Sequence, residues 1–192
     1  MARIGTVMRD TKETQIEVAV NLDGGDVNVK TGIGFFDHML TAFGFYAKIG
    51  LTVQATGDLY VDGHHTVEDV GICLGLALKQ ALGDRAGIRR FGSCYVPMDE
   101  ALTFTALDFS NRPFLVFDGE MPQSMIGTYD SCLTVEFMRA LAMNAGITLH
   151  QKCFYGANAH HITEGLFKSL GMAVRDAVKV EGSGVVSTKG GL

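Results

Sequence analysis

The second half of the sequence repeats part of the first, and this repeat limits the folds open to the chain. Residues 64–82 align with 160–178, and seven of the nineteen aligned positions are identical. Ordinary composition would give about one identity. We therefore predict two copies of one structural unit, each about half the chain. The identical pairs are His64/His160, His65/His161, Glu68/Glu164, Leu74/Leu170, Gly75/Gly171, Ala77/Ala173 and Ala81/Ala177.

Hydrophobic periodicity predicts both strands and helices in each half. Apolar residues alternate at 15–22, and shorter apolar runs predict further strands at 51–55, 101–107, 113–117 and 147–152. Helical spacing of apolar residues predicts long helices at 67–81 and 162–177 and shorter ones near 35–43 and 135–144. We predict an α+β fold, each half a small mixed sheet with two helices on one face. The halves then pack helix side to helix side.

The predicted units are 1–96 and 97–181, followed by a tail at 182–192. A chain of 192 residues with 47% hydrophobic residues is large enough for a buried core. The tail is rich in Gly, Ser and Thr, so we expect it to be mobile until a ligand orders it.

Charge and cysteine content exclude several classes of protein. The net charge of -5 and the lack of a basic run argue against nucleic acid or a membrane surface as partner. The four cysteines form no close pair, so we expect buried free thiols rather than disulfides or a thiolate zinc site. The sequence begins without an apolar signal segment, and we expect a soluble cytoplasmic protein.

Four of the six histidines form two HisHis-x-x-Glu units at the starts of the predicted long helices. On a helix, His64 and Glu68 project about 40° apart and can bind one ion, whereas His65 projects about 100° away. The simplest arrangement has two ions, each bound by the His and Glu of one helix and the remaining His of the other. The second unit consists of His160, His161 and Glu164.

Residue type alone leaves several choices open. A single histidine is usually a hydrogen-bonded core or surface residue, and on that basis His38 and His150 are as consistent with a structural role as with a metal. Carboxylate ligands favour manganese or iron, while the absence of paired thiols weakens the case for zinc. Ferritin-like di-iron bundles use Glu-x-x-His, the reverse order, and contain no strands.

Several segments of the chain resemble the imidazoleglycerol-phosphate dehydratase family. The main motifs are GFFDHML at 34–40, DGHHTVED at 62–69 and NAHHITE at 158–164. Shorter similar segments are RFG at 90–92, MDEAL at 98–102, SNRP at 110–113, TLH at 148–150, FK at 167–168 and STKG at 187–190. The resemblance extends over nearly the whole chain.

This resemblance implies a duplicated α+β fold and a particle of 24 subunits with active sites between subunits. It also implies two Mn²⁺ ions per subunit. The family pattern assigns one ion to His38, His65, His160 and Glu164, and the other to His64, Glu68, His150 and His161.

The implied reaction removes water from imidazoleglycerol phosphate to give imidazole acetol phosphate in histidine biosynthesis. The two ions would hold the substrate ring as imidazolate, with His64, His65, Glu68 and Glu164 as catalytic ligands. Glu13 matches the family's acid/base residue, although its residue type alone suggests an exposed carboxylate at a strand edge. Asp99 and Glu100 fall in a family motif but gain no role from it. The positions that match phosphate-binding residues are Arg90, Arg112, Lys168, Ser187 and Lys189.

Two other functions fit parts of the pattern. A binuclear metal-dependent hydrolase would use the same His and Glu ligands but would need no imidazole in its substrate. A metal-binding assembly protein would have no use for the phosphate-binding residues. In the dehydratase interpretation, the glycines of the tail let Ser187 and Lys189 close over bound phosphate, so truncation after Glu181 should raise the KM.

Overall fold

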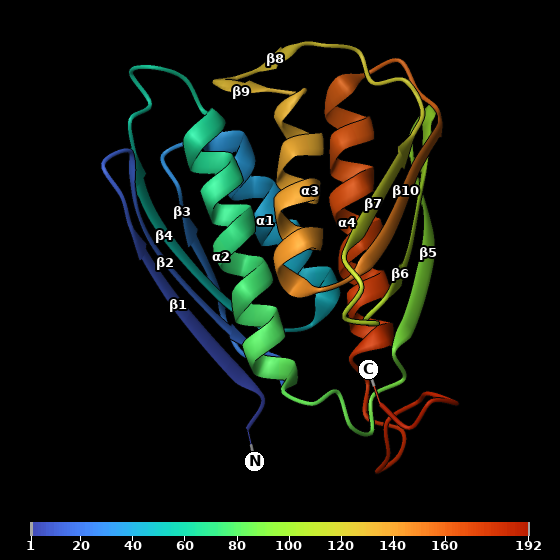
Figure 1. Cartoon of the computed structure of the whole chain (residues 1–192). Helices are drawn as coiled ribbons and strands as arrows, with labels where there is room; N and C mark the ends of the chain where they lie inside the picture. The colour runs from blue at the N-terminus through green and yellow to red at the C-terminus, as the bar shows by residue number, and fades with distance from the viewer. Residues whose placement is uncertain (1, 192) are drawn as a thin grey trace.

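The structure, a computed structural model, describes residues 2–191 and places four helices between two four-stranded sheets (Figure 1). Each sheet is mixed, with two antiparallel pairings and one parallel pairing. The first sheet has the order β1-β2-β4-β3 and the second β5-β6-β10-β7. The predicted α+β fold and its internal duplication are therefore confirmed, since both halves follow the same path.

The elements of the first half are β1 (Ile4–Asp10), β2 (Thr14–Asn21), β3 (Val27–Lys30), α1 (Gly34–Ala47), β4 (Gly50–Gly57) and α2 (His64–Leu82). Those of the second half are β5 (Phe91–Met98), β6 (Ala101–Asp108), β7 (Phe114–Asp118), α3 (Leu133–Ala145), β10 (Thr148–Tyr155) and α4 (Ala159–Ala177). A short hairpin of β8 (Met125–Ile126) and β9 (Tyr129–Asp130) precedes α3.

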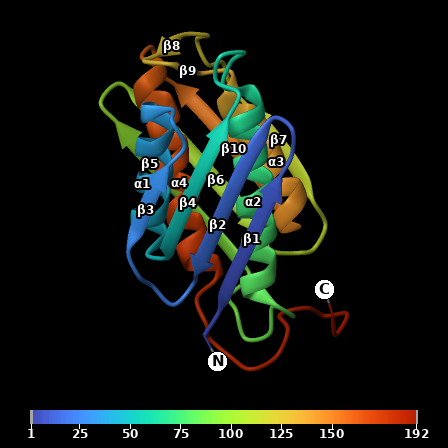
Figure 2. The ribbon, with the colours of Figure 1, turned by 90° about the vertical axis from the view of Figure 1, so that its left-hand side faces the viewer.

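The helices of the two halves pack against each other across the centre of the molecule. Helix α2 contacts α3, and α4 contacts α1. The other face of each long helix covers a sheet: α2 lies on β1 and β2, and α4 lies on β5 and β6 (Figure 2). Fully buried aromatic rings join the halves, because the Phe36 ring centroid lies 5.4 Å from that of Phe137 and 6.4 Å from that of Phe167.

Repeated small residues allow this close packing. A Cβ atom on Gly75 would lie 2.8 Å from the Leu141 carbonyl oxygen of α3, and one on Gly171 would lie 2.7 Å from the Phe43 carbonyl oxygen of α1. Such distances leave no room for a side chain at either position. The identity of Gly75 and Gly171 in the repeat thus reflects two equivalent helix contacts.

The connection between the halves differs from the predicted boundary. The predicted first unit includes residues 91–96, but these form most of β5, which belongs to the second sheet. The first sheet and its helices end with α2 at Leu82. The alignment of 64–82 with 160–178 marks equivalent helices and carries no information about where the next strand begins.

The tail contacts the connection between the halves, and the cysteines depart from expectation in part. The backbone of the tail is bonded to the connection between the halves, because Gly87 donates to the Gly184 carbonyl at 2.9 Å and Arg90 Nη1 donates to the Val186 carbonyl at 2.6 Å. All four cysteines are free, but only Cys73 and Cys153 are buried. Within residues 2–191, no helix combines the length and the apolar character needed to cross a bilayer.

Candidate metal centre

Equivalent polar residues begin the two helices that carry the histidine pairs. The backbone N–H of His64 donates to Asp62 Oδ1 at 2.7 Å, and that of His160 donates to Asn158 Oδ1 at 2.9 Å. Each bond satisfies one of the N–H groups left free in the first helical turn. Both histidine pairs are therefore fixed in the first turn of a long helix, as the sequence predicts.

One group of potential ligands is assembled within the chain, from α1 and α4. Glu164 Oε2 lies 3.0 Å from His160 Nε2 and 3.5 Å from His38 Nε2. Among residues 2–191, these three form the group whose ligand atoms all lie within 4.8 Å of one another. Phe35 packs its ring 4.9 Å from that of His160 and 6.3 Å from that of His38, which supports both imidazoles from one side.

The surroundings of Glu164 favour its ionised carboxylate form. Its residue is only 6% exposed, and Lys168, one turn later, donates to Oε1 at 2.7 Å. Burial acts to raise the pKa of Glu164, but the Lys168 hydrogen bond and charge outweigh it, so the pKa lies below its ordinary value. One carboxylate oxygen therefore faces the histidines while the other is neutralised by Lys168.

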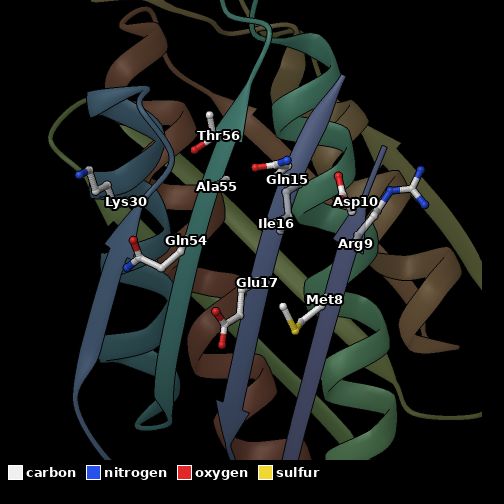
Figure 3. A pocket seen from close by; sticks show the side chains of 10 residues that line it. All are labelled: Met8, Arg9, Asp10, Gln15, Ile16, Glu17, Lys30, Gln54, Ala55 and Thr56. Carbon is white, nitrogen blue, oxygen red and sulfur yellow. The ribbon is translucent and has the colours of Figure 1, made fainter. Parts of the chain in front are cut away.

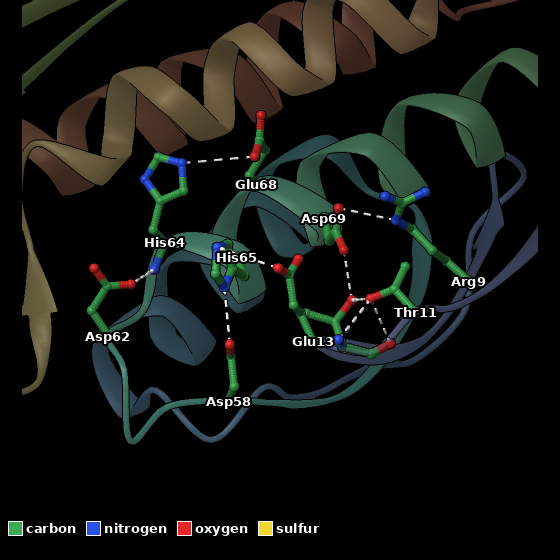
Figure 4. A network of polar contacts seen from close by, with 10 residues as sticks. Arg9, Thr11, Glu13, Asp58, Asp62, His64, His65, Glu68 and Asp69 are labelled. Atoms are coloured by element: carbon green, nitrogen blue, oxygen red, sulfur yellow. Dashed lines mark hydrogen bonds and ion pairs between the residues drawn. The ribbon is translucent and has the colours of Figure 1, made fainter.

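The first histidine pair has a different environment (Figure 4). His64 Nε2 lies 3.7 Å from Glu68 Oε2, as expected for residues four apart on one helix. His65 turns away, and its Nδ1 donates to Asp58 Oδ2 at 3.0 Å. That hydrogen bond raises the pKa of His65. With Nδ1 engaged, Nε2 is the nitrogen left to bind a metal.

In the second pair, a carboxylate from the hairpin between β5 and β6 orients His161, as Asp58 orients His65. His161 Nδ1 donates to Glu100 Oε2 at 2.7 Å, and the backbone N–H groups of Ala157 and Asn158 donate to Glu100 Oε1. These bonds, that of His161 first, lower the pKa of Glu100 to about 2. Asp99, the neighbouring residue, lies 3.6 Å from His161 Nε2 and is exposed.

Sequence reasoning did not identify Asp58 or Glu100 as residues that orient histidines. For Glu100, the only signal was its place in the MDEAL motif. For Asp58, a carboxylate six residues before a histidine pair has no characteristic spacing, because it lies in the loop between β4 and α2. Both contacts depend on how a loop or hairpin folds back over the helix start.

A single chain does not assemble the two four-ligand groups expected above. His65 does not join His38, His160 and Glu164, because α4 packs against α1 whereas α2 packs against α3. His150 lies third in β10 and is exposed, while its neighbour Gln151 is buried and donates to the Leu166 carbonyl of α4. Since side chains alternate along a strand, His150 faces away from the helices.

The candidate phosphate-binding residues divide into two groups. Arg90 donates two hydrogen bonds to Asp108, at 2.6 and 2.9 Å, and Arg112 Nη2 lies 3.7 Å from the same carboxylate. The tail meets this pair through Val186, one residue before Ser187. Lys168 lies apart from them, beside Glu164, so it does not share their surroundings in one chain.

Comparison with known proteins gives the family. The model of the family "Imidazoleglycerol-phosphate dehydratase" matches residues 31–174. The chain belongs to the imidazoleglycerol-phosphate dehydratase family. It is 54% identical to the imidazoleglycerol-phosphate dehydratase of Ruminiclostridium cellulolyticum, over 99% of this chain and 100% of that protein. Its identity to the Rhodopseudomonas palustris (strain BisB5) protein of that name is 55%, over 99% and 98% of the two chains.

Solved structures of the dehydratase family have the same fold. The structure of IGPD from Pyrococcus furiosus in complex with (S)-C348 superposes with a TM-score of 0.85 at 42% identity, covering 97% of this chain and 100% of that one. The dehydratase from Staphylococcus aureus gives a TM-score of 0.84 at 35% identity, covering 92% and 99%. The duplicated arrangement of sheets and helices is therefore a property shared with the family.

In this dehydratase-family chain, the His38, His160 and Glu164 cluster and the Arg90 group lie at opposite ends of α4. Arg90 N–H donates to the carbonyl of Ala177, the last residue of α4, whereas His160 is the second. At about 1.5 Å per residue, the helix separates them by about 25 Å. A small substrate cannot reach from the histidines to Arg90 of the same chain.

A shallow depression on the outer face of the first sheet contains none of the candidate site residues (Figure 3). It lies over β1 to β4 on the face turned away from the helices, and its lining includes Met8, Glu17, Lys30 and Gln54. The groups brought together by the helix starts remain the candidate site of this family member.

Proposed function

We propose that the chain catalyses the dehydration of imidazoleglycerol phosphate to imidazole acetol phosphate, a step of histidine biosynthesis, with two Mn²⁺ ions bound per subunit. Membership of the family supports the reaction. The observation that carries the metal part is the His38, His160 and Glu164 cluster. A cytoplasmic location agrees with such a biosynthetic role.

The donor groups suit the proposed ions. Imidazole nitrogens combined with a carboxylate oxygen, and no thiolate, favour manganese or iron over zinc. Glu164 offers Oε2 to the cluster while Lys168 occupies Oε1, which leaves one oxygen for an ion. For the second ion, His64 and Glu68 would supply the ligands from α2.

Glu13 is the residue we assign to proton transfer. Its side chain is 55% exposed, and its Oε1 lies 3.9 Å from Nε2 of His65, a candidate metal ligand. This distance is too long for a hydrogen bond, so the carboxylate is free to accept a proton. When bound, the two ions would supply Lewis acidity, which would make the imidazole ring of the substrate easier to deprotonate. Glu13 would take the proton from the substrate C–H, and this proton and the departing hydroxide make up the water that is lost. The enol that remains becomes the ketone when its hydroxyl proton is transferred to carbon.

Assembly of several subunits would complete the site. One chain brings together three residues of the first predicted ligand group and two of the second. The Arg90 group lies about 25 Å from the cluster along α4. A neighbouring copy would supply His65 to the cluster, and another the Arg90, Arg112, Ser187 and Lys189 contacts to phosphate. We propose the 24-subunit particle of the family as this assembly.

The decisive experiment measures product and metal together. We expect the purified protein to bind two Mn²⁺ ions per chain, to form imidazole acetol phosphate, and to lose this activity with chelator. Glu164→Gln and His64→Ala should each lower the metal content and abolish dehydration. Glu17→Gln removes a carboxylate from the outer face of the first sheet and should change neither.

The binuclear hydrolase makes the opposite prediction in the same assay. It would release phosphate from a generic phosphate ester and would need no imidazole ring in its substrate. Hydrolysis of this kind, or dehydration by protein with fewer than two ions per chain, would reject the proposed function.

A further inference from the structure

A buried carboxylate holds both strands of the hairpin that carries Glu13. Asp69 lies on α2, one turn after His65, and is only 6% exposed. Its Oδ2 accepts a hydrogen bond from Thr14 Oγ1 at 2.6 Å. Its Oδ1 lies 3.0 Å from Arg9 Nε (Figure 4). Arg9 belongs to β1 and Thr14 to β2, so one side chain fixes both strands to the helix. We call these three residues the Asp69 clasp.

The turn beyond the clasp holds the backbone of Glu13. Thr11 Oγ1 accepts hydrogen bonds from the N–H groups of Glu13, at 3.1 Å, and Thr14, at 2.9 Å. The Glu13 carbonyl in turn accepts from the Asp58 N–H at 3.1 Å. Asp58 is the residue that orients His65. The Glu13 backbone is therefore connected on both sides to groups that lie on α2 or contact it.

The second repeat shows that the fold does not require this carboxylate. Gly165 occupies the position equivalent to Asp69 in the alignment of the two helices. It lies against Thr103, a fully buried residue of β6 whose hydroxyl donates to the Val96 carbonyl at 3.3 Å. A buried threonine and a small helix residue thus suffice to pack a strand on a helix. A buried charge is costly unless it is paired, so Asp69 needs a reason other than packing.

We propose that Asp69 is a positioning residue that acts through Thr14 and Arg9 to hold Glu13 at the reacting carbon of the substrate. The inference rests on the proposed function, in which Glu13 transfers the proton. Glu13 is largely exposed and is not itself locked by a side-chain bond, so the hairpin backbone sets where its carboxylate can reach. Proton transfer depends steeply on such placement, because a shift of about 1 Å can cost about 100-fold in rate.

The test removes the clasp without touching Glu13 or the metal ligands. Thr14→Val keeps the shape of the side chain but removes the hydroxyl that donates to Asp69. We expect kcat to fall about 10- to 100-fold, with KM and the number of bound Mn²⁺ ions unchanged. Thr14→Ser restores a hydroxyl and should restore most of the activity. Asp69→Asn, which keeps the size but loses the charge that pairs with Arg9, should lower kcat in the same way.

Thr105→Val is the matched control. Thr105 is a buried strand residue of the second repeat, and its hydroxyl bonds to Ser169 of α4 at 2.7 Å. Its loss should lower stability but leave kcat as in the wild type. If Thr105→Val lowers kcat as much as Thr14→Val, the effect is general loosening of a strand on a helix, and the proposal is wrong.

A double-mutant cycle separates the positioning role from the proposed function. If Asp69 acts through Glu13, Thr14→Val should add almost no loss of kcat to a Glu13→Gln variant. A full additional loss in that background would reject the positioning role alone. A fully active Glu13→Gln variant would reject the proton-transfer role of Glu13, and the positioning role with it.

Discussion

Replacement of Gly171 by alanine tests whether the repeat explains how the two halves join. Gly171 lies on α4 where the helix crosses α1, and a Cβ atom there would be 2.7 Å from the Phe43 carbonyl oxygen and 3.1 Å from the Ala47 nitrogen. Both neighbours are helix backbone, which cannot turn aside as a side chain would. The helices must separate by several tenths of an ångström to accept the methyl group, and the buried contacts around them weaken.

Two opposing effects set the size of the loss. Overpacking a close-packed core costs about 1–3 kcal/mol of folding free energy. Because the neighbours of Gly171 are rigid backbone atoms, we expect the cost of Gly171→Ala to be about 3 kcal/mol. Alanine regains about 1 kcal/mol over glycine from helix propensity. The free energy of unfolding should therefore fall by about 2 kcal/mol, and Tm by about 4–8 °C in a chain of this size.

Urea denaturation followed by circular dichroism measures this change, at one fixed subunit concentration because assembly adds to apparent stability. Gly34→Ala is the matched control, since nothing lies within 4 Å of the Cβ position at the start of α1. We expect it to be neutral or slightly stabilising. If Gly171→Ala is as stable as Gly34→Ala, close helix approach does not explain the repeated glycine.

Three further predictions follow from other parts of the chain. Truncation after Val186 keeps the tail's backbone bonds to Gly87 and Arg90 but removes Ser187 and Lys189. The substrate KM should therefore rise while the metal content stays constant, and an unchanged KM would show that the tail does not close over the phosphate. The Arg3 backbone N–H and then its side chain lower the pKa of Asp23, so this carboxylate stabilises the fold above its ordinary pKa of 3.8 and loses that contribution as the pH falls through the lowered value. The stability difference between wild type and Asp23→Asn in urea should accordingly shrink below about pH 4, and a difference that grows with acid would contradict it. Burial raises the pKa of both Cys73 and Cys132 to about 11, so accessibility decides which thiol reacts. A small thiol reagent should modify the exposed Cys132 in the native protein and spare buried Cys73, as peptide mass spectrometry would reveal.

The fold could be predicted largely from sequence because its long elements have a clear period. The helices at 64–82 and 159–177 were found by helical spacing and by their mutual identity. Strands β3 and β5 were not predicted. Neither has a fully buried face: β3 has only four residues, none of them buried, and β5 has a single buried residue, Val96. Val27 and Val29 alternate with Asn28 and Lys30 in β3, but a run of four residues is too short to identify a strand, and β5 has no clear apolar alternation.

The site could be predicted only where its geometry is local. The spacing of His64 and Glu68, and of His160 and Glu164, follows from the helix and is what the structure shows. That His38 lies beside His160 depends on α1 packing against α4, which no local pattern encodes. The pairing of Lys168 with Glu164 is again local, because the two residues lie four apart on α4, although the family pattern places Lys168 at the phosphate. The roles of these residues as ligands and phosphate contacts remain predictions.

The two repeats have diverged in how they hold the second histidine of each pair, and this difference leaves the Glu13 carboxylate exposed while Glu100 is bonded. In the first repeat, Asp58 of the loop before α2 bonds to His65, so the hairpin carboxylate of Glu13 stays exposed. In the second, the hairpin carboxylate of Glu100 itself bonds to His161 and to two backbone N–H groups, and its lowered pKa makes it a poor base. Duplication could supply two equivalent sets of ligands, but proton transfer needs one carboxylate that is held in place and left unbonded. In the proposed function the first repeat, with its loop aspartate and its buried clasp, meets both conditions.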